Sequence, residues 1–175
     1  MLTKRMLPAI TLLLLSAPVI PAAPASAASG ATQCTFEHEV VASPGLSTSP
    51  TSGTITTNGE TGTFACDGPV NGKQPTGPGT SGSEGRYGTK GPDTCQSGGE
   101  GDAVMSMTIP TAGGPERIKN TATYEFGAFK AGAPFSATFT GDRMSGTMEV
   151  TPIDGDCASK PVTRYRVTGK GTLKG

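Results

Sequence analysis

Alternation between apolar and polar residues, broken at short intervals by glycine or proline, is the feature that most constrains this sequence. Beyond residue 27, nearly every helix-length window contains one of the chain's 26 glycines or 15 prolines, which argues against helices. Threonine, valine, phenylalanine and tyrosine instead recur at every second position, the pattern of half-buried strands. The sequence therefore predicts an all-β fold, an antiparallel meander of about eight or nine strands. Its two expected forms are a lipocalin-like barrel and a flattened sandwich.

Three predicted hairpin turns give this meander a register. Asn58-Gly59 favours a type I′ turn, Gly141-Asp142 is compatible with a type II′ turn, and Gly113-Gly114 forms the third. Each turn keeps the apolar side chains of its two strands on one face, which a slip of one residue would reverse. The predicted opposite pairs are Ile55 with Gly62, Ile109 with Ile118, and Phe139 with Met144.

The N-terminal segment has the features of a secretory signal peptide. Lys4 and Arg5 precede an apolar run that is too short to cross a bilayer, and Ala25-Ser26-Ala27 forms a cleavage site. We expect residues 1–27 to be removed and residues 28–175 to form a single extracellular all-β domain with no membrane insertion. Without Lys4 and Arg5, 12 basic residues face 14 acidic ones, a net charge of −2 that gives no basic footprint for nucleic acid.

The four cysteines are expected to stabilise a chain whose apolar core is small. The predicted domain has only two leucines, Leu46 and Leu173. An even number of cysteines in an exported protein indicates disulfides, and we expect Cys34–Cys66 and Cys95–Cys157 because the first pair lies on neighbouring predicted strands. Zinc is the alternative, but no C-x-x-C pair exists and the chain has a single histidine.

No residue pattern indicates a catalytic site or a cofactor. His38 is the only imidazole, and its neighbours Glu37 and Glu39 are predicted to point outward, away from it. The segment 77–82 matches G-x-G-x-x-G but lacks the strand before and the helix after that phosphate binding needs. Asp154 and Asp156 are too few for a calcium site and are expected to stabilise a turn, although weak calcium binding there stays open.

The predicted inner face is the surface with most functional interest. Aromatic and methionine side chains lie beside many glycines and alanines, which predicts either a fully packed interior or a barrel with room for one small apolar ligand. A polar side chain could fix one end of such a ligand. The candidate ligand-binding residues are Phe36, His38, Phe64, Met105, Met107, Asn120, Tyr124, Phe126 and Tyr165.

Several segments resemble a group of small exported proteins from high-GC Gram-positive bacteria. They are 34–36 (CTF), 43–46 (SPGL), 94–98 (TCQSG) and 151–163, which contains TPIDGDC. The composition is also similar to that of secreted apoproteins of the neocarzinostatin type, β-sandwiches with two disulfides that carry a chromophore, although their cysteines are spaced more closely. The first resemblance implies no activity, and the second implies a carrier role.

Three functions are compatible with these features. The first is a secreted, non-enzymatic barrel or sandwich that binds a small apolar ligand on its inner face. The second is an extracellular structural or partner-binding module, such as an inhibitor of a secreted enzyme, presenting the Pro/Gly-rich segment 68–82 as a mobile loop. The third is an enzyme that uses His38.

Overall fold

A computed structural model of the chain describes residues 31–174, and these form an all-β structure. The signal peptide predicted at residues 1–27 lies outside the described residues. Among residues 31–174 there is no helix with the length and apolarity needed to cross a membrane. The strands are β1 (Thr32–Leu46), β2 (Gly53–Thr56), β3 (Gly62–Asp67), β4 (Gly79–Tyr87), β5 (Gly99–Ile109), β6 (Glu116–Phe126), β7 (Phe135–Gly141), β8 (Met144–Asp154) and β9 (Val162–Leu173).

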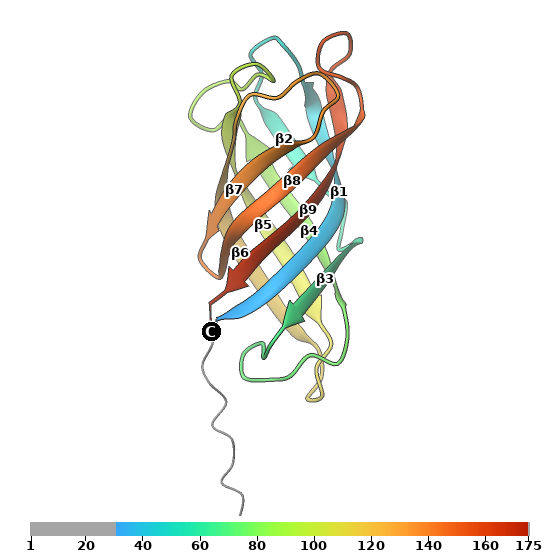
Figure 1. Cartoon of the computed structure of the whole chain (residues 1–175), viewed down its shortest axis with the longest axis vertical. Helices are drawn as coiled ribbons and strands as arrows, with labels where there is room; N and C mark the ends of the chain where they lie inside the picture. Colours follow the sequence, from blue (N-terminus) through green and yellow to red (C-terminus); the bar gives the residue numbers. More distant parts are fainter. Residues whose placement is uncertain (1–30, 175) are drawn as a thin grey trace, which may run out of the picture.

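The strands form one antiparallel sheet that closes into a barrel (Figure 1). Closure is made by β1 and β9, which pair along most of their length. β2 and β3 each pair with both β1 and β4, so these two short strands share one position and the nine strands make an eight-stranded barrel. The antiparallel meander predicted from the sequence is confirmed, and of its two expected forms the structure shows the barrel and not the flattened sandwich.

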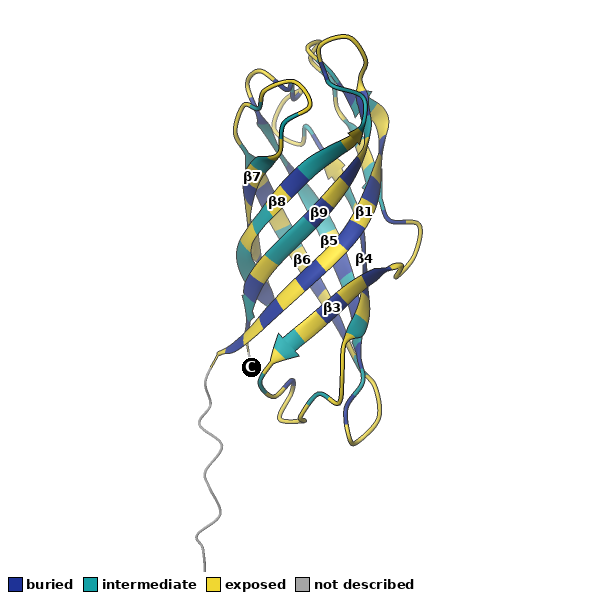
Figure 2. Cartoon of the chain, turned by 45° about the vertical axis from the view of Figure 1, so that its right-hand side comes forward, coloured by how far each residue is buried: buried dark blue, intermediate teal, exposed yellow. Residues whose placement is uncertain are grey.

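The tilt of the strands follows from the register around the barrel. A row of opposite residues that leaves β1 at Gln33 and crosses every other position returns to β1 at Ser43, ten residues further along. Figure 2 shows the tilt of the strands and the alternation of buried and exposed residues along them. A barrel of eight strands is just wide enough to be filled by side chains or to hold one small ligand.

The hairpin predicted at Asn58-Gly59 does not form. Both residues adopt the positive φ values expected of this turn, 55° and 109°, but the flanking strands continue in the same direction instead of pairing. Ile55 lies opposite Ala42 and Gly85, and not opposite Gly62. β1 and β4 offer hydrogen-bonding edges on either side of β2 and β3, so these two segments pair with β1 and β4 and not with each other. Asn58-Gly59 is therefore a short excursion between two segments of one interrupted strand.

The other two predicted hairpins form with a register that differs by two residues. Phe139 lies opposite Gly146 and not Met144, and Ile118 lies opposite Met107 and not Ile109. A shift of two residues leaves every side chain on its predicted face, because side chains in a strand alternate with a period of two. The predicted faces are therefore right and the predicted partners are wrong.

The β3–β4 loop lies across the lower end of the barrel, as drawn in Figure 1. The strand β4 begins at Gly79, so the segment predicted as a loop over 68–82 is shorter than expected. Val70 in this loop is fully buried, and Pro75 bridges to Thr111 on the β5–β6 connection. The loop therefore closes the barrel end instead of standing free. The buried side chains above it are Phe64, Met107, Ile109, Ile118, Met144 and Leu173.

Four loops meet at the upper end of the barrel and form a cap. A disulfide joins Cys95 of the β4–β5 loop to Cys157 of the β8–β9 loop, and both cysteines are buried. Cys95 also bonds through its backbone to Ser47 of the β1–β2 loop and Phe129 of the β6–β7 loop. A second disulfide, Cys34–Cys66, links β1 to β3 near the lower end. This is the connectivity expected from the sequence, and it is typical of proteins in oxidising compartments.

Candidate functional site

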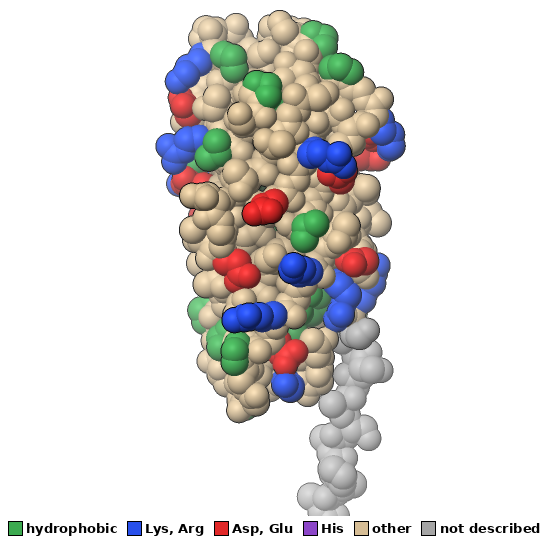
Figure 3. Space-filling view, turned by 180° about the vertical axis from the view of Figure 1, so that it is seen from behind, with side chains coloured by type: hydrophobic (Ala, Val, Ile, Leu, Met, Phe, Trp, Pro, Cys, Tyr) green, Lys and Arg blue, Asp and Glu red, His purple; other side chains and the backbone are tan. Residues whose placement is uncertain are grey.

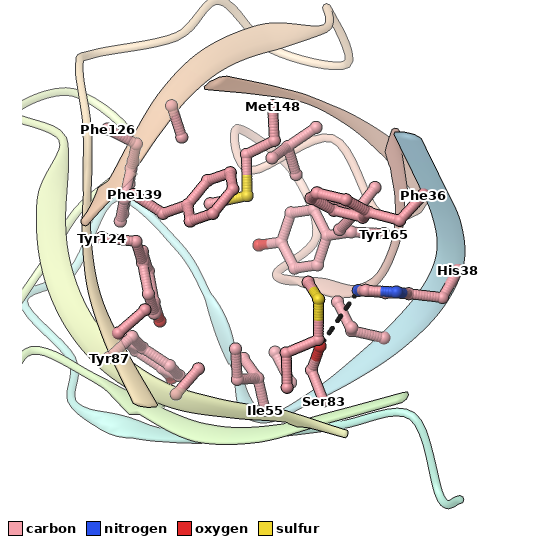
Figure 4. A pocket seen from close by; sticks show the side chains of 18 of the residues that line it. Phe36, His38, Ile55, Ser83, Tyr87, Tyr124, Phe126, Phe139, Met148 and Tyr165 are labelled. Atoms are coloured by element: carbon pink, nitrogen blue, oxygen red, sulfur yellow. Dashed lines mark hydrogen bonds between the residues drawn. The ribbon is translucent and has the colours of Figure 1, made fainter. Parts of the chain in front are cut away.

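A cavity of about 110 Å³ lies inside the barrel, beneath the cap and above the packed lower end. Its walls come from every barrel position, and most of its lining side chains are aromatic or aliphatic. Figure 4 shows the rings of Phe36, Phe139, Tyr124 and Tyr165 turned toward the lumen. Small inward residues leave this space, among them Ala103 and Ala122, which lie opposite each other on β5 and β6. The interior is thus packed in one part and hollow in another.

Seven of the nine candidate ligand-binding residues line this cavity, and the barrel brings them together from four strands. The other two, Phe64 and Met107, are almost fully buried but lie outside the cavity, in the packed lower core. The seven residues are Phe36, His38, Met105, Asn120, Tyr124, Phe126 and Tyr165.

His38 lies in a chain of hydrogen bonds that sequence reasoning missed. Its Nε2 is 3.1 Å from Ser83 Oγ, drawn as a dashed line in Figure 4, and its Nδ1 is 3.4 Å from Ser81 Oγ. The Ser81 hydroxyl donates a hydrogen bond to the carbonyl of Thr63, so its oxygen must accept a hydrogen bond from His38 Nδ1. The imidazole therefore carries its proton on Nδ1, and Ser83 donates to Nε2.

This relay resembles a nucleophile and its base, but it differs from a catalytic triad in two features. The group behind the imidazole is the hydroxyl of Ser81, whereas catalytic triads place a carboxylate there to stabilise the imidazolium. Burial lowers the pKa of His38 from 6.5 to about 4, which makes the imidazole a weak base at neutral pH. His38 is neutral in the folded protein above about pH 5.

Asn120 contributes a polar group with unused bonding capacity. Its Oδ1 accepts from the backbone N–H groups of Arg143, at 2.9 Å, and Met144, at 2.7 Å. These bonds tie β6 to the β7–β8 turn and explain why a buried asparagine interrupts an apolar face. The Nδ2 group of the same side chain is buried without a partner among the described residues. An unsatisfied buried donor costs about 1–3 kcal/mol.

Three tyrosine hydroxyls lie on the upper half of the cavity wall, and each donates to a backbone carbonyl. Tyr87 donates to Pro44, Tyr124 to Arg86 and Tyr165 to Val162. These bonds satisfy the hydroxyl protons inside an otherwise apolar wall. Burial raises the pKa of both Tyr124 and Tyr165, so the hydroxyls stay neutral at any physiological pH.

Asp93 is a buried carboxylate in the cap that sequence reasoning also missed. It accepts from the backbone N–H groups of Gly88 and Glu100, which fixes the β4–β5 loop. Burial raises its pKa, and its negative charge also raises the pKa of the nearby Tyr87 and Tyr124 hydroxyls. The upper part of the cavity therefore lies near a negative charge.

The acidic pair predicted as a turn element is engaged within its own loop. Asp154 contacts Lys160 and Thr163, and Asp156 accepts from the backbone of Ser159 and Lys160. Among the described residues, no three His, Cys, Asp or Glu side chains gather as metal ligands would. The G-x-G-x-x-G match runs from the β3–β4 loop into β4, and no helix follows it.

The outer surface carries charges of both signs. On the face in Figure 3, acidic and basic side chains are interspersed. Several form ion pairs across strands, such as Arg86 with Asp102 and Glu39 with Arg164.

No protein-family model, no curated protein and no solved structure matches this chain. The resemblance to exported proteins of high-GC Gram-positive bacteria, and to neocarzinostatin-type apoproteins, therefore stays a prediction.

Proposed function

We propose that this protein is a secreted, non-enzymatic carrier that binds one small apolar molecule in the barrel cavity. The observation that carries this proposal is an internal space of about 110 Å³ bounded by aromatic and aliphatic side chains. An engineered cavity of about 150 Å³ with such walls stays dry and takes up benzene or xenon. Two disulfides and a predicted signal peptide support a role outside the cell.

Native mass spectrometry of protein purified from the culture medium of its own host tests the proposal. We expect extra mass in the native spectrum that disappears on denaturation. The denatured mass at the same time reports cleavage after Ala27 and the presence of two disulfides. Absence of extra mass would count against the carrier function and favour a search for an extracellular protein partner.

Two matched variants connect the bound mass to the cavity. Ala122→Leu adds three carbons to an inward side chain that lines the cavity, whereas Thr123→Leu changes the next, outward-facing residue. We expect the first variant to lose the extra mass and the second to retain it. Retention by both variants would place the bound molecule elsewhere.

A further inference from the structure

Five of the polar side chains around the cavity spend their protons on partners within the protein. The hydroxyls of Tyr87, Tyr124 and Tyr165 each donate to a backbone carbonyl. Ser83 donates to Nε2 of His38, and the other ring nitrogen of that histidine donates to a serine hydroxyl outside the cavity wall. These five side chains therefore have no proton left to donate to a ligand.

Asn120 is the sixth polar residue of the wall, and its amide is out of reach of a ligand. Its Oδ1 accepts from the backbone N–H groups of Arg143 and Met144. The amide lies against Gly141, where a side chain would collide with it. Its Nδ2 has less than 1 Å² of accessible surface, toward solvent or cavity. Asn120 therefore ties β6 to the β7–β8 turn and presents no hydrogen-bonding group to the lumen.

The surface that faces the cavity is almost wholly apolar and carries no charge. Among the described residues that line it, none is Lys, Arg, Asp or Glu. Burial lowers the pKa of His38 to about 4, so its ring is uncharged at neutral pH. A polar or ionised group on a ligand would lose its hydration on entry and gain neither a hydrogen bond nor a counter-charge in return. The wall therefore selects against polar ligands.

From these observations, and resting on the proposed carrier function, we infer that the ligand is a hydrocarbon of about one ring that carries no hydrogen-bonding group. The cavity of about 110 Å³ is somewhat smaller than the engineered cavity of about 150 Å³ that takes up benzene, so one ring fills it. The ligand is held by dispersion against the aromatic wall, where Phe36 and Phe139 meet edge to face at 5.8 Å. Alcohols, ketones and carboxylates of the same size are excluded by the same argument.

Toluene, phenol and benzoate test this inference on the full mature protein with both disulfides formed. The three probes share one ring and differ in carrying a methyl, a hydroxyl or a carboxylate group. We expect toluene to bind at least about tenfold more tightly than phenol, and benzoate to bind most weakly. Naphthalene adds a second ring without a polar group and should bind more weakly than toluene. Titration calorimetry at neutral pH measures the four dissociation constants.

The variant Ser83→Ala should make the wall accept a polar ligand. Without the Ser83 hydroxyl, Nε2 of His38 keeps a lone pair with no donor, beside the space that the hydroxyl occupied. A phenol hydroxyl can take that place and donate to Nε2. We expect this variant to bind phenol about fivefold to tenfold more tightly than the unaltered protein does, with toluene affinity changed by less than about twofold. Ser81→Ala is the matched control, because it leaves Ser83 bonded to Nε2 and should show no gain for phenol.

The outcomes separate this inference from the carrier function. Binding of phenol or benzoate as tight as that of toluene would overturn the hydrocarbon inference and leave the carrier function intact. Tighter binding of naphthalene than of toluene would overturn the limit of one ring. No gain for phenol in Ser83→Ala would overturn the view that pairing within the wall is what rejects polar ligands. If that variant does not fold, the comparison of toluene with phenol in the unaltered protein decides. Failure of all four probes to bind would count against the carrier function itself.

Discussion

His38 couples the stability of the barrel to pH. Its pKa in the folded protein is about 4, whereas the unfolded chain has the ordinary value of 6.5. As pH falls below 6.5 the unfolded state takes up a proton first, so the stabilising effect of the neutral imidazole is present above pH 6.5 and is lost by about pH 4. At 1.36 kcal/mol for each pKa unit, the loss amounts to about 3 kcal/mol. Denaturant titrations between pH 7 and pH 4 measure it.

The variant His38→Gln isolates this contribution from that of the carboxylates. Glutamine keeps a hydrogen-bonding side chain in the relay but does not titrate. We expect the free energy of unfolding of this variant to fall less steeply with acidification than that of the unaltered protein, by the same 3 kcal/mol or so over the interval. Parallel pH profiles for the two proteins would show that His38 does not titrate with a lowered pKa.

At the residue scale, the sequence predicts which way a side chain points better than what it contacts. Alternation along β1 placed His38 inside, between Phe36 and Val40, and that placement is confirmed. Ser81 and Ser83 face inward for the same reason, but small polar residues in a glycine-rich strand carry no signal that distinguishes a partner of an imidazole from a surface serine. Their roles follow only from the β3–β4 and β1–β3 pairings.

The interrupted strand formed by β2 and β3 depends on its excursion at Asn58-Gly59. Gly59 has φ = 109° and no neighbouring atom where a Cβ would lie, so only backbone strain opposes a side chain there. We expect Gly59→Ala to lower the free energy of unfolding by about 1–2 kcal/mol.

Gly91 is the matched control because it also has open space around it but no positive φ. Gly91→Ala should change stability by less than about 0.5 kcal/mol. Thermal or denaturant unfolding of the two variants makes the comparison, and an equal effect would exclude strain as the cause.

The errors of register have one physical origin. The face of the sheet on which a side chain lies alternates from one residue of a strand to the next, and burial of the apolar face strongly enforces this choice. The partner across the ladder depends on loop length, which changes in steps of two without moving any side chain to the other face. The β7–β8 turn therefore centres on Asp142 and Arg143, one residue beyond the predicted turn, because Asn120 holds the backbone of Arg143 and Met144.

On the scale of the whole molecule, the cap lies over the upper end of the barrel and joins its loops to one another. Its four loops are distant in sequence, and Cys95 contacts the other three through one disulfide and two backbone hydrogen bonds. The cysteine pairing could be predicted, but the sequence held no signal that these loops meet over a cavity. Nor could it separate a packed interior from a hollow one, because glycine and alanine next to aromatic residues suit both. Whether space is left inside depends on how the volumes of the inward-facing side chains add up around the eight strands.

The two disulfides should differ in what they protect, although each should contribute similarly to stability. They close segments separated by 32 and 62 residues, for which the chain-entropy relation gives roughly 4 kcal/mol each. Replacing Cys95 and Cys157 by serine should free the cap. Amide hydrogen exchange should then accelerate at Phe129 and at Thr51, whose N–H groups bond to Cys95 and Asp93.

Replacing Cys34 and Cys66 by serine is the matched control, because it removes a disulfide of similar entropic weight from the opposite end. We expect faster exchange in the first residues of β1 and in β3, with the cap amides still protected, in conditions where both variants stay folded. Equal acceleration of the cap amides in both variants would mean that global unfolding controls exchange and that the cap has no separate motion. A ligand could then leave only when the barrel itself opens. Selective acceleration in the Cys95 and Cys157 variant would instead identify the cap as the part of the barrel that opens, because its loops would move while the strands beneath them stay paired.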